Sequence, residues 1–165
     1  MIIKISYRAV FAFIAITCFS LVGYALYLQL GPEKQQPCPL CILQRYAYIF
    51  VGLVAAIAAL HNLGIRRYAW ALTFFAGSGV GFAIWQLTKG ESMRGCLADP
   101  IGEFVNGLPM SAWWDGQLFF ATGGCADKYP PTLGLSVPTW SLICFTLLMT
   151  GGIVMLLKKR RAASV

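Results

Sequence analysis

The chain has 165 residues, of which 58% are hydrophobic and 12% are charged, and its formal net charge is +7. A soluble globular domain is typically about 25% charged. The composition therefore argues against a soluble enzyme, a secreted disulfide-rich module, a nucleic-acid-binding domain and an intrinsically disordered chain.

Four stretches carry no formal charge, and their bounds are 9–30, 46–65, 68–88 and 129–157. Each is long enough for a helix to cross about 30 Å of hydrocarbon. Prolines and glycines at the edges refine the expected helix ends. We predict one all-α membrane domain over residues 1–165, with four transmembrane helices at about 9–30, 42–63, 68–88 and 138–157, and outer loops at about 31–41 and 89–137.

Two of the predicted spans carry further local signals. Lys4 and Arg8 precede the first apolar run, as in a signal peptide. That run is longer than the roughly 7–15 residues of a signal-peptide core, and no small-x-small cleavage site follows it, so we expect an uncleaved span. In the third span, Gly77 and Gly81 have the small-xxx-small spacing that allows helices to approach closely.

Basic residues are distributed unevenly between the two ends of the predicted bundle. The N-terminus, the 62–67 turn and the C-terminus together contain eight basic residues and no acidic one, whereas the outer loops contain all six acidic residues. Because basic residues beside spans stay on the cytoplasmic side, we expect both termini inside and both loops outside. The basic tail at 158–161 is expected to contact anionic lipid headgroups rather than nucleic acid.

The second outer loop is too apolar for a plain linker. We expect a short amphipathic helix within it, lying in the membrane interface, and a partly buried mini-domain is the alternative. The apolar residues that indicate this are Ile101, Phe104, Val105, Leu108, Met110, Trp113, Trp114, Leu118, Phe119 and Phe120.

Six cysteines divide into two groups. Cys18 and Cys144 fall in mid-span and are expected to be small buried apolar residues. The other four fall in the outer loops, where thiols meet oxidising conditions, so they predict two disulfides with three possible connectivities. The natural pairing joins neighbours within each loop, Cys38 with Cys41 and Cys96 with Cys125.

The first pair has the spacing of a redox couple. A Cys38–Cys41 disulfide closes almost no loop, so its chain-entropy stabilisation is small, and C-x-x-C is more typical of redox chemistry. Cys41 is expected near the N-terminus of the second helix, where the helix dipole favours a thiolate. Arg45 lies four residues on, and either snorkels to a lipid phosphate or holds an anion or a cofactor oxygen beside Cys41.

Other chemistries are excluded by missing partners in the sequence. The only histidine, His61, is expected at the opposite end of the second span, and residue 42 is not the histidine that a c-type haem motif requires. We predict no metal site, because Cys96 and Cys125 do not form the second close pair of a Cys₄ zinc site. A lipid-soluble quinone is then the expected electron acceptor, docking near Cys41 among Leu43, Tyr46 and Tyr48.

These motifs together resemble the disulfide bond formation protein B (DsbB) family of bacterial inner-membrane thiol oxidases. The resemblance covers essentially the whole chain, including the order of four spans. It rests on Pro-Cys-x-x-Cys-x-x-x-Arg at 37–45, Cys96, Leu108-Pro109 with Trp114, Gly124-Cys125-Ala126, Leu133-Gly134-Leu135, Pro138 and Trp140.

The resemblance implies a function and a mechanism. A periplasmic thioredoxin-like oxidase of the DsbA type would deliver its electrons to a Cys96–Cys125 disulfide, with Cys96 forming the mixed disulfide. Cys125 would exchange with Cys38, which requires a mobile second loop, and Cys41 would face ubiquinone or menaquinone with help from Arg45. Electrons would leave as quinol for the respiratory chain.

Two alternatives differ in class from this thiol oxidase. One is a four-helix quinone or epoxide reductase that consumes thiols, which resembles the chain less because such enzymes place C-x-x-C deep within a helix. The other is a non-catalytic four-span scaffold whose loops are held by disulfides. A scaffold would have no need of a C-x-x-C pair beside Arg45.

Overall fold

The computed structural model describes residues 6–31, 34–61, 64–89, 100–112, 118–125 and 131–162. Within these ranges the chain forms five helices: α1 Tyr7–Leu30, α2 Pro39–His61, α3 Ile65–Lys89, α4 Pro100–Asn106 and α5 Val137–Ala162. The four long helices are long and apolar enough to cross a membrane. The predicted all-α fold with four candidate spans is confirmed, and it indicates a multi-pass membrane protein.

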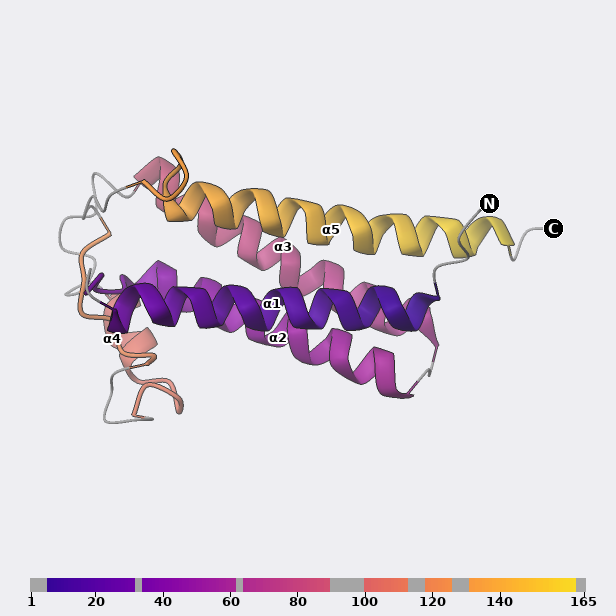
Figure 1. The fold of residues 1–165 in the computed structure, drawn as a ribbon, viewed down its shortest axis with the longest axis horizontal. Coiled ribbons are helices and arrows are strands. Elements are labelled where there is room, and N and C mark those ends of the chain that lie inside the picture. Colours follow the sequence, from indigo (N-terminus) through magenta and orange to yellow (C-terminus); the bar gives the residue numbers. More distant parts are fainter. Residues whose placement is uncertain are drawn as a thin grey trace.

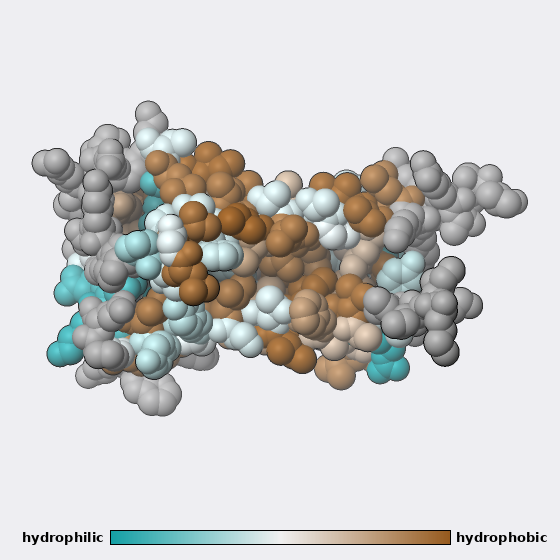
Figure 2. All heavy atoms as spheres, turned by 45° about the horizontal axis from the view of Figure 1, so that its top comes forward, coloured by the Kyte–Doolittle hydropathy of each residue, from teal (hydrophilic) through white to brown (hydrophobic). Residues whose placement is uncertain are grey.

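The long helices form a bundle in which α2 packs against α1 and α3, and α3 packs against α5 (Figure 1). The core between them contains Phe11, Cys18, Val51, Leu72 and Phe145. Large apolar side chains also cover the outside of the bundle, as the brown surface in Figure 2 shows. An outer surface of this kind suits lipid rather than water.

The two ends of the bundle differ in what they carry. The start of α1, the end of α2, the start of α3 and the end of α5 lie at one end, and α4 lies at the other (Figure 1). α4 is the short helix expected in the second loop, and it packs on α2 through Val105 and Ile42. The assignment of these ends to cytoplasm and periplasm stays a prediction.

Two of the predicted helix starts need correction. α2 begins at Pro39 rather than at 42, because proline suits the first turn of a helix and Cys38 caps it. α3 begins at Ile65 rather than at 68, because Arg66 and Arg67 continue the helix beyond its charge-free part. A stretch without charged residues therefore indicates the membrane-crossing part of a helix, and the helix itself can extend beyond that stretch.

The close approach in α3 occurs at a different glycine from the predicted pair. A methyl group at Gly79 would overlap the Phe145 ring of α5, with Cζ 2.6 Å from the added carbon. At Gly77 the nearest atom is Met149 Sδ at 3.7 Å, and nothing lies within 4 Å at Gly81. The small-xxx-small spacing therefore does not form the contact between helices.

Gly79→Ala is expected to destabilise the bundle by about 1–3 kcal/mol, a typical cost of overpacking. The Phe145 ring cannot easily yield, because it is fully buried and stacks on Tyr48 with centroids 4.0 Å apart. Thermal unfolding of the purified protein in detergent should show a lower midpoint for Gly79→Ala. Gly81→Ala is the matched control and should keep the wild-type midpoint; equal midpoints for both variants would contradict the packing argument.

Candidate redox site

The C-x-x-C pair is built into the N-terminus of α2. The Cys38 carbonyl accepts the first helical hydrogen bond from Ile42 N at 3.1 Å, and Cys38 Sγ accepts one from Cys41 N at 3.2 Å. Cys38 is therefore the N-cap, with sulfur in the place usually taken by a serine or aspartate oxygen. Pro39 occupies the first helical position, and Cys41 lies within the first turn at the positive end of the helix dipole.

The two cysteine pairs differ in redox state. Cys38 and Cys41 are free thiols, whereas Cys125 is disulfide-bonded. Cys96, its predicted partner, lies outside the described residues. The predicted Cys38–Cys41 disulfide is not formed here. The C-x-x-C turn keeps the two residues close in the dithiol state as well as in the disulfide state. The spacing predicts proximity and leaves the redox state open.

A glutamine of α3 connects the two free thiols. Gln86 Nε2 donates to Cys38 Sγ at 3.4 Å and to Cys41 Sγ at 3.2 Å. Gln86 Oε1 in turn accepts a 2.8 Å hydrogen bond from Gln44 Nε2 of α2. Both amides are buried. Neither glutamine was predicted as a site residue, although two amides within apolar spans are a signal of polar contacts between helices.

The two thiols have unequal environments. The hydrogen bond to Cys41, and after it burial, raise the pKa of Cys38 above its ordinary value. Cys38 is also almost completely enclosed, at 2% exposure, whereas Cys41 is partly exposed to a cavity. Cys38 is therefore the thiol that keeps its proton, and Cys41 is the sulfur that can meet another reactant.

The segment carrying Cys125 is docked directly onto the first loop. Thr122 N and Gly123 N both donate to Pro37 O at 3.1 Å. Cys125 packs in one buried cluster with Cys38 and Leu40. A mobile second loop was expected to bring Cys125 to Cys38, but the two residues already pack together here.

Asn106, the last residue of α4, holds the other side of the same segment. Its side chain accepts from Ala121 N at 2.8 Å and donates to Ala121 O at 3.3 Å. Residues 121–123 are therefore hydrogen-bonded both to α4 and to the first loop. A side-chain amide that binds one residue's N–H and C=O substitutes for a neighbouring strand, which orders the segment without a sheet.

Arg45 is buried at 7% exposure and joins three parts of the chain. Its Nη1 donates to Gln29 Oε1 at 2.6 Å and to Leu118 O at 2.9 Å, and its Nη2 donates to Ala25 O at 3.4 Å. These bonds tie α1 and the second loop to α2. The two bonds on Nη1 use both of its hydrogens, so donors for a ligand remain only on Nη2 and Nε.

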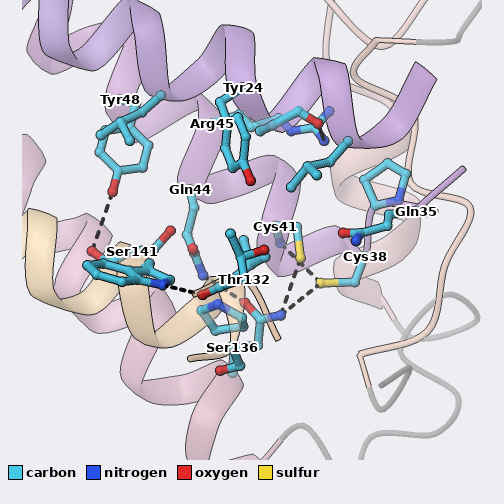
Figure 3. A pocket seen from close by; sticks show the side chains of 18 of the residues that line it. Tyr24, Gln35, Cys38, Cys41, Gln44, Arg45, Tyr48, Thr132, Ser136 and Ser141 are labelled. Carbon is cyan, nitrogen blue, oxygen red and sulfur yellow. Dashed lines mark hydrogen bonds between the residues drawn. The ribbon is translucent and has the colours of Figure 1, made fainter. Parts of the chain in front are cut away.

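A cavity of about 870 Å³ lies beside these groups (Figure 3). Cys38, Cys41, Cys125 and Arg45 are among its lining residues. Figure 3 shows Tyr48 and Ser141, which also line it, on the side away from Cys38. Its walls come from α1 and α5, including Leu21, Val22, Leu28, Val137 and Cys144. Cys18 is buried in the core as predicted, but Cys144 is half-buried and faces this cavity.

Two predicted quinone contacts do not line the cavity. Tyr46 packs instead toward α4, in the cluster that contains Val105 and Phe119, and Leu43 packs against that cluster and against the one formed by Cys38, Leu40 and Cys125. The reason is the helical period of about 100° per residue, which places residues 41, 45 and 48 on one face of α2 and residues 43 and 46 on another. Tyr48, which shares the face of Cys41, does line the cavity.

Comparison with known proteins identifies the family. A family model for "Disulfide bond formation protein DsbB" matches residues 7–155. The chain belongs to the DsbB family. A relative from Ralstonia nicotianae named disulfide bond formation protein B is 40% identical over 159 residues, which cover 93% of this chain and 96% of that protein. A relative of the same name from Cupriavidus necator is 41% identical over 138 residues, covering 82% of this chain and 84% of that protein.

Membership in the DsbB family makes this chain a disulfide bond formation protein and hence a disulfide oxidoreductase. A third relative with this name, from Nitrosomonas europaea, is 40% identical over 144 residues and is covered over 86% of its length. The free dithiol and the Cys125 disulfide around one cavity agree with such an activity. The non-catalytic scaffold is therefore the weaker alternative.

Proposed function

We propose that this DsbB-family protein is a membrane thiol oxidase that oxidises a thioredoxin-like disulfide donor and passes the electrons to a membrane quinone. The donor is of the DsbA type, and ubiquinone or menaquinone is the acceptor. The observation that carries the proposal is the shared cavity: Cys125, Cys41 and Arg45 all line it, and apolar side chains of two candidate membrane spans form its walls.

The cavity has the properties that a quinone would need. Its volume of about 870 Å³ lies within the usual range for small-molecule sites. Leu21, Val22 and Val137 would contact a hydrocarbon ring or tail, and the remaining donors of Arg45 would reach a carbonyl oxygen. When bound, a quinone supplies a two-electron, two-proton acceptor; the chain's own residues must supply the thiols and bind the acceptor.

The thiol chemistry proceeds by disulfide exchange. A thiolate of the donor attacks the disulfide of Cys125, with Cys96 taking the mixed disulfide, and the donor leaves oxidised. Cys125, now reduced, attacks Cys38 of an oxidised Cys38–Cys41 pair and frees Cys41. Cys96, freed when the donor's second thiol displaced it, then attacks Cys125 of the Cys125–Cys38 disulfide, which restores the Cys125 disulfide and releases Cys38. Cys38 and Cys41 are left as a dithiol, which is the redox state described here.

The dithiol then returns to a disulfide by giving two electrons and two protons to the quinone, which leaves as quinol for the respiratory chain. Cys41 is the sulfur that meets the acceptor, since it is the more exposed of the two thiols. Cys38 closes the new disulfide onto Cys41. Overall, two donor thiols and one quinone become one donor disulfide and one quinol.

The proposed location is the bacterial inner membrane, with both termini in the cytoplasm and the redox loops in the periplasm. Arg8, Arg66 and Arg67 support this orientation, because all three lie at the end of the bundle opposite the cysteines. The donor would then approach from the periplasm and the quinone from the membrane.

The direct test is quinone reduction by purified protein in detergent or lipid, driven by a reduced thioredoxin-like donor and followed by quinone absorbance. Catalytic quinol formation that requires both the donor and this protein would support the proposal. Quinol formation from small thiols without benefit from the donor would favour the thiol-consuming reductase. Donor oxidation without quinol formation would contradict the assigned acceptor.

Arg45→Ala is expected to raise the apparent KM for quinone by about tenfold or more, the usual effect of losing a hydrogen bond from a charged group. The KM for the thiol donor should change much less, because the donor meets the Cys125 disulfide. Steady-state kinetics with each substrate varied separately would measure both. Arg45→Lys is the control for charge alone, and equal changes in both KM values after Arg45→Ala would contradict the cofactor role.

A further inference from the structure

Gln86 of α3 donates hydrogen bonds to both sulfurs of the C-x-x-C pair. A side-chain amide nitrogen carries two hydrogens, so it can donate to two acceptors at once. Gln86 is 9% exposed and projects from α3 across to the N-terminus of α2. Its position brings two donor hydrogens to the sulfurs from a helix that carries neither cysteine.

The orientation of this amide matters because its two ends have opposite character. With the nitrogen toward the sulfurs it stabilises a negative charge, whereas with the oxygen toward them it repels one. The first orientation is the one present: Gln44 Nε2 donates to Gln86 Oε1 at 2.8 Å, which occupies the acceptor end and leaves the nitrogen toward the sulfurs. Gln44 is itself buried, at 5% exposure. The Gln44–Gln86 pair therefore presents hydrogens to the thiols.

A thiolate at Cys41 needs such donors. Its sulfur faces a cavity with largely apolar walls, where an uncompensated charge is costly. Arg45 contributes positive charge, but its Nη1 is committed to Gln29 and Leu118 O. Titratable side chains that line the same cavity are Tyr24 from α1, Cys38, Arg45 and Tyr48 from the first loop and α2, and Cys144 from α5. The amide from α3 adds the donors that these groups do not supply.

We propose that Gln86 is a positioning residue that stabilises the Cys41 thiolate, and that Gln44 fixes the orientation in which Gln86 can do so. The pair favours the reduced dithiol, because a thiolate accepts hydrogen bonds more strongly than a disulfide sulfur does. This inference deepens the proposed function, since it assigns control of the same thiol chemistry. It concerns the sulfurs alone, so it can be tested without quinone or donor.

The test measures alkylation of Cys41 by iodoacetamide in the reduced full-length protein, across a series of pH values. Site-resolved peptide mass spectrometry separates Cys41 from the other cysteines. Only a thiolate alkylates quickly, so the rate at each pH reports the thiolate fraction. Gln86→Met keeps the side-chain length and removes both donors. We expect its alkylation at pH 7 to be about tenfold slower and its profile to move to more alkaline pH.

Two further variants separate orientation from mere packing. Gln44→Met frees the Gln86 amide to turn over, so it should give a smaller shift in the same direction. The double variant should match Gln86→Met, because Gln44 acts only through Gln86. Thr88→Val is the control: it removes a hydroxyl two residues away in α3 that bonds only to its own helix, at Ile84 O and Trp85 O, and should leave the profile unchanged.

A wild-type alkylation profile for Gln86→Met, in protein with the normal circular dichroism spectrum, would overturn the inference. If Gln86→Met does not fold, Gln86→Glu provides the second measurement, because it keeps the shape and replaces the donors by a repelling carboxylate. A wild-type profile for that folded variant would overturn the inference as well. Failure of the wild-type quinone assay would contradict the proposed function without affecting these rates.

Discussion

Cys41→Ser is expected to abolish donor-driven quinone reduction, while the disulfide of Cys125 remains reducible by the donor. Without the Cys41 sulfur, no Cys38–Cys41 disulfide can form, so the reduced Cys125 has no disulfide in that pair to attack and the electrons cannot pass on to the quinone. The serine N–H can still donate to Cys38 Sγ, so the cap of α2 should persist. The loss should therefore be a loss of chemistry and not of fold.

Two measurements check this prediction. Steady-state quinol formation should fall to background, whereas one equivalent of donor should still be oxidised in a single turnover. Cys144→Ala is the control, because Cys144 is another thiol that lines the same cavity, and its variant should retain the turnover number. Full turnover by Cys41→Ser would show that Cys41 is not the sulfur that meets the quinone.

Gly123→Ala is expected to slow exchange between the two cysteine pairs by about tenfold or more, because disulfide exchange requires the attacking thiolate to reach its target sulfur. Gly123 lies where the second loop contacts the first, through its hydrogen bond to Pro37 O. An added methyl group would overlap Gln36 O, with Gln36 C at 3.0 Å and Gln36 Cβ at 3.1 Å. Since two of these atoms are backbone, a rotamer change cannot relieve the overlap.

Residues 122 and 123 hold the second loop on the first loop through their hydrogen bonds to Pro37 O. Moving residues 122–123 away from Gln36 lengthens both hydrogen bonds to Pro37 O and separates Cys125 from the cluster with Cys38. Rapid-mixing experiments should show that the donor still reduces the Cys125 disulfide at a normal rate. Quinol formation after that step should be slow.

A matched glycine variant controls for general damage to the outer loops. Gly134 has φ +83 with nothing within 4 Å of an added carbon, so Gly134→Asn should be tolerated, because asparagine adopts positive φ more readily than most residues. Its quinol formation should stay near the wild-type rate. An equally fast second step in Gly123→Ala would show that loop docking does not limit the exchange between the pairs.

Much of the site could be predicted from residues that share one helix. Cys38, Pro39 and Cys41 form the start of α2 because of their own sequence, and Arg45 follows on the same face after four residues. Leu43 and Tyr46, which were predicted as quinone contacts, do not line the cavity, and the helical period places them on another face of α2 than Cys41. Local geometry of this type does not depend on the rest of the fold.

Contacts between helices could not be predicted in the same way. Gln86 lies 45 residues from Cys41 along the chain, and nothing in their spacing indicates that they bond. Gly79 meets Phe145 and Gly123 meets Gln36 for the same reason: each contact depends on how two separate segments are rotated and shifted against each other. A sequence reveals that small or polar residues are present, and only packing decides which of them meet.

The amino-acid sequence by itself determined four apolar helices, a thiol pair at the start of the second one and an arginine on the same face, because apolar length and helical period are properties of a single segment. The tertiary structure alone decided that Cys125 packs beside Cys38 and that a glutamine of α3 bonds both thiols. It also decided that the thiols line a cavity together with residues of α1 and α5. These features arise where segments far apart in the chain come together. They depend on how the side chains and backbones of those segments pack against one another, which no single segment determines.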